Sequence, residues 1–143
     1  MTVADVVDVL GGRGVVDADG ESELDFVRAV REGLPTSAVD AILDDGTLSP
    51  DELERLVLPR RTLAHRRKHG QRLARDESDR LSRVARVVAT ANETLTSRER
   101  SALWLRRPNR ALGGATPLDL LETGDGARLV EDVLGRIAHG VFS

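Results

Sequence analysis

The 143-residue chain contains no cysteine and only three aromatic residues, Phe26, Trp104 and Phe142. Without cysteine, the chain cannot form disulfides or offer a thiolate to zinc, to an iron–sulfur cluster or to a substrate. Single-stranded nucleic acid is bound largely by stacking bases on aromatic side chains, so the few rings argue against an RRM or OB-type reader. Thiol chemistry is therefore excluded, and base stacking is disfavoured.

Long apolar runs are also absent. No stretch approaches the ~20 apolar residues that span a bilayer, and Asp5 and Asp8 lie where a signal peptide would carry cations. Hydrophobic residues nonetheless make up 40% of the chain, which is enough to form a buried core. We expect a folded, cytoplasmic protein without membrane contact.

Acidic residues are missing from one central segment. Residues 59–75 hold seven cations and no acid, whereas residues 1–58 hold four arginines against 14 acids and residues 76–143 hold ten of each. Such a basic block steers and holds a polyanion even though the whole chain carries a net charge of −3. A solvated basic helix is the competing interpretation.

Helix start and stop signals are frequent, and no strand alternation competes with them. Ser49-Pro50-Asp51-Glu52 predicts a capping box with proline at the first helical position, and Thr96 with Glu99 predicts a second box. Apolar spacing and the glycine and proline stops predict further helices near residues 3–10, 22–33, 35–46, 76–95, 96–107 and 116–124, and a last one that packs through Leu129, Val130, Val133, Leu134 and Ile137. We expect an all-α protein.

The basic block lies in a setting that suits DNA. Pro59 ends one short helix near Leu58, and a second helix is predicted from Arg60 to Lys68. Two short helices joined in this way have the dimensions of a helix-turn-helix, whose second helix enters the major groove. Leu63 is expected to face the core. The candidate DNA-binding residues are Arg60, Arg61, Thr62, His65, Arg66 and Lys68.

Patterns for catalysis or metal binding are missing. His65 and His69 have a spacing that can hold zinc, but no third ligand is evident. Gly11-Gly12-Arg13-Gly14 lacks the preceding strand and the third glycine of a dinucleotide fingerprint. The many acids lie mostly at helix starts, where capping explains them. We expect no enzyme activity, no cofactor and no metal site.

Several short pieces, taken in their order and spacing, resemble the Xre/MbcA/ParS-type antitoxins of bacterial RES-Xre toxin–antitoxin systems. The resemblance extends from about Leu24 to the last residue. The matching pieces are Gly33-Leu34-Pro35, Pro59-Arg60-Arg61-Thr62-Leu63, Glu77-Ser78-Asp79-Arg80-Leu81, Trp104-Leu105 with Pro108-Asn109, Leu112-Gly113-Gly114, Thr116-Pro117-Leu118 with Leu121 and Thr123, and Gly140-Val141-Phe142-Ser143. The Leu58-Pro59 turn departs from the glycine of many helix-turn-helix proteins, and residues 17–25 match nothing distinctive.

The resemblance implies an Xre-like helix-turn-helix half followed by a small helical toxin-binding half. Together with the helix pattern, it divides the chain into an N-terminal helical extension over residues 1–33, a DNA-binding region over 34–75 and a dimerisation and toxin-binding domain over 76–143. The implied partners are operator DNA and a cognate RES-domain toxin that consumes NAD or uses it to modify a target. The implied assembly is a homodimer, or a larger oligomer with the toxin, that represses its own operon.

The resemblance also implies a role for the apolar end of the chain. In complexes of this family the antitoxin tail lies at the active-site cleft of the toxin, so Phe142 and the Ser143 carboxylate are expected to enter subsites for a ring and for phosphates. The candidate toxin-binding residues are Leu134, Ile137, Gly140, Val141, Phe142 and Ser143. Of these, Leu134, Ile137 and Val141 face a partner only if the internal core does not need them.

A second function fits the same residues. A solitary transcriptional regulator, whose carboxy-terminal half only dimerises, shares every expectation about the basic block. The two functions differ in the tail and in the neighbouring gene, because only an antitoxin needs a toxin beside it.

Overall fold

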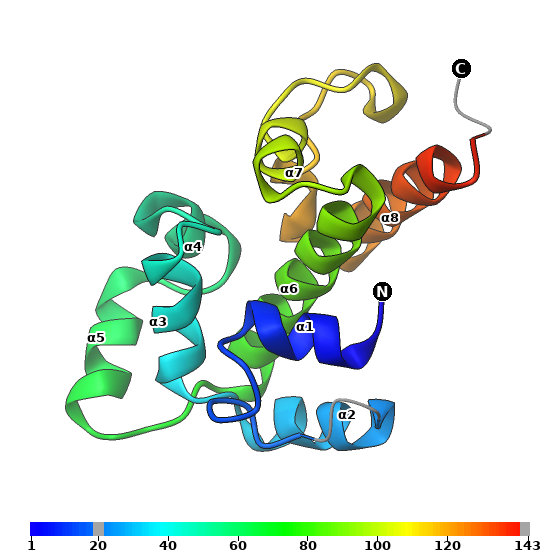
Figure 1. Ribbon diagram of the computed structural model, residues 1–143. Helices are drawn as coiled ribbons and strands as arrows, with labels where there is room; N and C mark the ends of the chain where they lie inside the picture. The colour runs from blue at the N-terminus through cyan, green and yellow to red at the C-terminus, as the bar shows by residue number, and fades with distance from the viewer. Residues whose placement is uncertain (19–21, 141–143) are drawn as a thin grey trace. The chain divides into compact units, whose positions relative to one another are not determined.

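The computed structural model describes residues 1–18 and 22–140, and this part of the chain contains helices and no strand (Figure 1). The all-α expectation is confirmed. The α-helices are α1 (Val3–Val9), α2 (Glu23–Glu32), α3 (Thr36–Asp44), α4 (Pro50–Leu56), α5 (Arg60–Lys68), α6 (Arg75–Leu95), α7 (Arg98–Leu105) and α8 (Gly124–Ala138), and the 3-10 helices are η1 (Arg110–Leu112) and η2 (Asp119–Glu122). No described helix is both long and apolar enough to cross a membrane.

Two compact units make up the chain, Met1–Ala85 and Arg86–Ser143, and α6 continues from the first into the second. The first unit contains α1 to α5 and the start of α6. Its buried residues come from every one of these helices and include Val6, Phe26, Val39, Ile42, Leu53, Leu56, Leu63 and Leu81. A core of this kind holds the short helices in place, since most of them are too short to be stable alone.

The start of α4 follows its sequence signal. The Ser49 hydroxyl accepts a hydrogen bond from the Glu52 backbone N–H, and the Glu52 carboxylate accepts one from the Ser49 backbone N–H. Pro50 occupies the first turn, and Leu48 and Leu53 are both buried. The predicted capping box is therefore confirmed, and it fixes the first residue of the helix-turn-helix.

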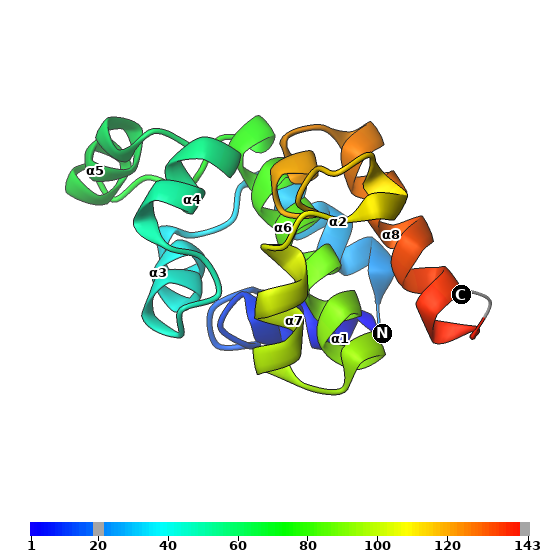
Figure 2. The same ribbon diagram turned by 90° about the horizontal axis from the view of Figure 1, so that it is seen from above.

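The second unit contains the end of α6, then α7, η1, η2 and α8. The connection from α7 to α8, yellow to orange in Figure 2, folds against α8 through η1 and η2. Gly126 allows the close approach of η2, because a Cβ atom there would lie 1.9 Å from the Leu120 carbonyl oxygen.

The predicted start of α7 is wrong by one residue. Ser97, not Thr96, is extended and accepts the capping hydrogen bond, from the Arg100 backbone N–H. Thr96 cannot serve because its backbone is left-handed, with φ 56°, and its N–H still bonds to Glu93 of α6. The Glu99 backbone N–H and the Ser97 hydroxyl hold the pKa of the Glu99 carboxyl below its usual range.

The helix predicted near residues 116–124 is also corrected. Only η2 forms there, because Thr123 is extended and caps the next helix, so that Gly124 begins α8 instead of ending a helix. Leu129, expected in the packing face of α8, is 54% exposed, whereas Val130, Val133 and Leu134 are buried. The apolar face of α8 is therefore narrower than the spacing suggested.

Candidate DNA-binding surface and toxin-binding unit

The turn between α4 and α5 is held by side chains from both sides. Pro59 precedes α5 and has no side chain that caps the helix, and the Glu54 carboxylate of α4 accepts the Arg60 backbone N–H at 2.9 Å instead. From α6, the Arg80 guanidinium donates to the Val57 carbonyl at 2.8 Å. These bonds give hydrogen-bond partners to an N–H at the start of α5 and a carbonyl at the end of α4. They therefore hold α5 in a fixed position relative to α4.

One side of α5 faces outward. Leu63 is buried in the core, as expected, whereas Arg61, His65 and Lys68 are exposed. Ala64 lies in the same row, at helical spacing, and sequence reasoning missed it. We call Arg61, Ala64, His65 and Lys68 the outward stripe. A small residue among cations lets a helix approach a groove closely. The sequence could have indicated Ala64, because helical spacing places it on the side of α5 away from the buried Leu63.

Two cations at the edges of this stripe have acidic neighbours. Arg60 forms an ion pair with Asp51 of α4, and Arg67 forms one with Asp40 of α3. Both guanidinium groups remain about half exposed. Exposed ion pairs contribute little to stability, so these arginines can exchange their carboxylates for phosphates.

Arg66 is turned away from the outward stripe. Its Nε lies 3.1 Å from Glu77 Oε1, its Nη2 lies 3.2 Å from Glu77 Oε2, and its Nη1 donates to the Gln71 side chain. Thr62 is half-buried. The structure therefore brings Arg61, His65 and Lys68 together, places Arg60 at their edge, and directs Arg66 to α6.

His65 and His69 lie one helical turn apart, with ring centroids 4.4 Å from each other. Within residues 1–18 and 22–140, no group of three or more histidine, aspartate or glutamate side chains is arranged to hold a metal ion.

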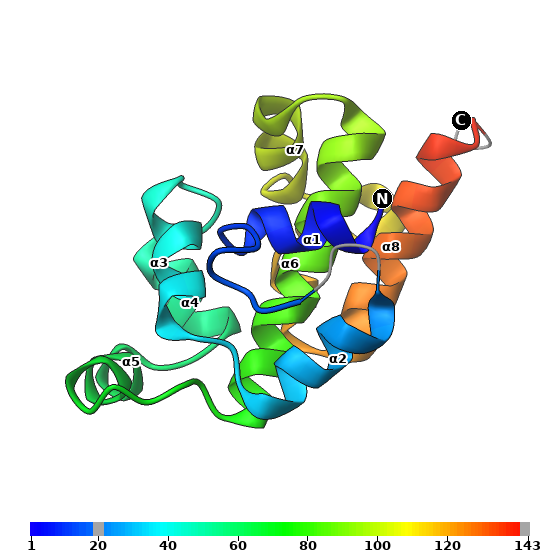
Figure 3. The ribbon, with the colours of Figure 1, turned by 60° about the horizontal axis from the view of Figure 1, so that its bottom comes forward.

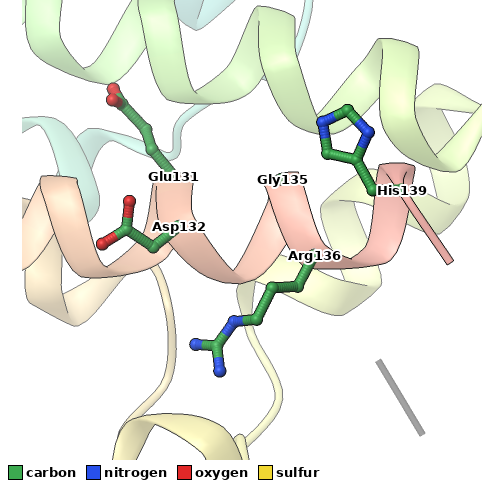
Figure 4. A pocket seen from close by; sticks show the side chains of 5 residues that line it. All are labelled: Glu131, Asp132, Gly135, Arg136 and His139. Carbon is green, nitrogen blue, oxygen red and sulfur yellow. The ribbon is translucent and has the colours of Figure 1, made fainter. Parts of the chain in front are cut away.

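The second unit offers a different kind of surface. A shallow depression follows the outer side of α8 and is lined by Glu131, Asp132, Gly135, Arg136 and His139 (Figure 4). Four of these residues belong to α8 and His139 follows it directly, so the depression suits the surface of a macromolecule better than an enclosed small molecule.

The candidate toxin-binding residues near the end of α8 are separated by burial. Leu134 is fully buried, so its predicted contact with a toxin is corrected: the core uses this side chain. Ile137 is half-buried and Gly140 is exposed after the end of the helix. Val141, Phe142 and Ser143 lie outside the described residues.

Comparison with known proteins matches both halves of the chain. Residues 25–86 match the antitoxin Xre-like helix-turn-helix domain, and residues 90–140 match the antitoxin Xre/MbcA/ParS C-terminal toxin-binding domain. The first match includes α4, α5 and the outward stripe, and the second includes α7, α8 and the depression on α8.

Relatives that match over most of their length are antitoxins as well. Antitoxin Xre of Yersinia enterocolitica is 34% identical over 120 residues, covering 82% of this chain and 81% of the relative. Antitoxin Xre of Pseudomonas putida is 32% identical over 119 residues, covering 83% and 74%. The Prs ADP-ribosylating antitoxin of a Sphingobium strain is 26% identical over 134 residues, covering 85% and 83%. This chain belongs to the Xre/MbcA/ParS antitoxin family: it carries the family's helix-turn-helix and toxin-binding domains, and it is an antitoxin and not an enzyme.

Proposed function

We propose that this antitoxin neutralises a RES-domain toxin and represses the operon that encodes both proteins, acting in the cytoplasm. The observation that carries the proposal is the pairing of two matched regions on one chain, a helix-turn-helix with an outward cationic stripe and a toxin-binding domain. The toxin-binding match also disfavours a solitary regulator whose second half only dimerises.

The class of toxin is tested by co-expression. The neighbouring open reading frame is expressed alone and together with this chain, and growth and cellular NAD are followed. We expect NAD to fall when the neighbour is expressed alone and to recover with the antitoxin. Growth arrest with unchanged NAD would exclude a toxin that depletes NAD, and labelled NAD then tests for modification of a target. A neighbour that neither lowers NAD nor transfers label from it to cellular protein would contradict the RES assignment, although the chain would remain an antitoxin.

We further propose that the tail, residues 140–143, enters the toxin. Phe142 supplies a ring for an apolar slot of the toxin. A site built for NAD also has hydrogen-bond donors for phosphates, and the Ser143 carboxylate can accept from these donors. Ile137, half-buried on α8 and three residues before the tail in the sequence, extends the contact. Deletion of residues 140–143 tests the proposal, because an antitoxin that still neutralises the toxin at equal concentration does not depend on its tail.

Repression requires two copies on one operator. A two-fold dimer places its two α5 helices ~34 Å apart, or a multiple of that, on a palindromic site. Light scattering on the purified chain and footprinting of its own promoter test this arrangement. A monomer that leaves the promoter unprotected at all concentrations would exclude autorepression without affecting neutralisation.

A further inference from the structure

We propose that Glu77 is a positioning residue for DNA recognition, which acts by holding Arg66 and thereby sets the direction in which the outward stripe of α5 faces DNA. Glu77 does not touch DNA in this proposal. The inference rests on DNA binding by the helix-turn-helix, and the class of the toxin does not enter it.

The Glu77 carboxylate is the meeting point of three hydrogen-bond donors. Its side chain is 8% exposed and accepts from Nε and Nη2 of Arg66, one bond to each oxygen. It also accepts the backbone N–H of Ala74 at 2.7 Å, just before α6 begins. One buried carboxylate therefore joins the last turn of α5 to the first turn of α6.

The attachment of α5 needs such a contact because little else holds the helix. Leu63 is the one buried residue among the nine of α5. Apolar packing at this single residue attaches the helix to the core but does not fix the rotation of α5 about that contact. The ion pairs of Arg60 and Arg67 are half exposed and contribute little. A two-point guanidinium–carboxylate pair fixes both distance and orientation, and its burial makes the geometry hard to abandon.

The start of α6 is itself anchored, so it can serve as the fixed side of this contact. Ser78, next to Glu77, accepts the Leu34 backbone N–H at 2.8 Å inside the first unit. In Figure 3 the end of α2 meets the start of α6 at this place. Movement of α5 relative to α6 is therefore opposed by the Arg66–Glu77 pair, whereas the Glu54 bond to the Arg60 backbone ties α5 to α4.

The Glu77→Gln substitution separates positioning from electrostatics because the two predict opposite changes. Removal of an acid near a cationic surface raises affinity for any duplex if charge alone matters. Glutamine keeps one acceptor for Ala74 but cannot pair two oxygens with Arg66, so a released α5 loses its fit to the bases. We expect affinity for the selected site to fall about tenfold, with unrelated duplex bound as tightly as before or more so.

Asp79→Asn is the matched control. It makes the same charge change two residues along α6, and Asp79 pairs only with Arg83 of the same helix in the described part of the chain. The probe is the tightest duplex that the parent chain selects from a random pool, compared with a shuffled duplex. Equal behaviour of Glu77→Gln and Asp79→Asn would overturn the proposal, as would failure of the parent to select any duplex.

Arg66 supplies a second, independent readout. If Arg66 contacted a phosphate, Arg66→Gln would lower the slope of log affinity against log salt by ~0.9. Positioning predicts weaker binding to the selected duplex with an unchanged slope, and partial rescue by Arg66→Lys, which keeps a cation for Glu77. Circular dichroism and toxin neutralisation by each variant show whether the fold and the second unit are intact. A lower slope would assign Arg66 to DNA and overturn the proposal.

Discussion

Arg61 and Lys68 are the cations of α5 that form no hydrogen bond or ion pair through their side chains in the described part of the chain. Every other cation of this helix has a carboxylate partner: Asp51 for Arg60, Glu77 for Arg66 and Asp40 for Arg67. DNA binding by Arg61 or Lys68 therefore breaks no internal contact. We expect the two residues to contribute most of the net electrostatic attraction of this helix.

The two residues are expected to act differently because they lie at opposite ends of α5. The N-terminal part of a recognition helix contacts base edges, so Arg61→Gln should cost about 1 to 3 kcal/mol at the selected site and relax its specificity. Lys68→Gln should weaken all duplexes alike and lower the salt slope by about 1. Fluorescence anisotropy titrations over a salt series measure both effects.

Arg13→Gln is the control for these substitutions. Arg13 is an exposed arginine outside the helix-turn-helix, so its replacement changes the net charge equally. If Arg13→Gln weakened binding as much as the α5 variants, overall charge and not the outward stripe would govern affinity.

The connection from α2 to α3 is tied to the segment that precedes α6. The Leu73 backbone N–H donates to the Leu34 carbonyl at 2.9 Å, and the Arg72 guanidinium donates to the Gly33 carbonyl at 3.1 Å. Gly33 has φ 105°, and a Cβ atom there would lie 2.4 Å from the Leu73 carbonyl oxygen. Glycine is therefore required at this position by its positive φ angle and by the closeness of the backbone at Leu73.

Gly33→Ala should destabilise the first unit by about 2 to 4 kcal/mol, since the left-handed strain adds to displacement of a hydrogen-bonded backbone. Gly46→Ala is the matched variant, because Gly46 has φ 78° with nothing within 4 Å of the new Cβ atom. That variant should lose only about 1 to 2 kcal/mol. Urea unfolding compares the free energies of unfolding of the two variants. Equal losses would show that the close contact between Gly33 and the Leu73 backbone adds nothing to stability.

Local signals are sufficient to predict α4 and α5. The bounds of α4 and α5 follow from Ser49, Pro50 and Pro59, whose effects depend only on neighbouring residues. The pattern predicts Thr96 as the cap of α7, but threonine and serine can both cap a helix, and Ser97 is the cap in the structure. The choice was made by α6, whose last turn takes Thr96 into a left-handed conformation.

Tertiary partners explain what the sequence pattern could not predict about the site. The sequence shows the charge of Arg66 and so predicts it among the DNA-binding residues, but it does not show that Arg66 pairs with Glu77, eleven residues away and past a loop. Leu129 and Leu134 are both leucines that fit the apolar spacing of α8. Only the packing of the folded chain leaves Leu129 exposed and buries Leu134. Periodicity identifies an apolar face, but not how wide a strip of it the core covers.

At the scale of the whole molecule, the two activities are assigned to different compact units. The outward stripe belongs to Met1–Ala85, and α8 with the tail belongs to Arg86–Ser143. Both units contain buried side chains, including Leu63 in the first and Val133 in the second. Substitutions on the surface of one unit should therefore leave the fold of the other unchanged.

This organisation predicts a reciprocal loss of function. The double variant Arg61→Gln with Lys68→Gln should lose promoter repression and still neutralise the toxin, whereas deletion of residues 140–143 should lose neutralisation and still repress. Both variants are expressed from an unrelated promoter at equal levels, so that lost autorepression does not raise the antitoxin concentration. A reporter fused to the native promoter measures repression, and growth with the toxin measures neutralisation. If either variant lost both activities while its circular dichroism spectrum stayed native, DNA binding and toxin binding would depend on each other, and the assignment of one activity to each unit would fail.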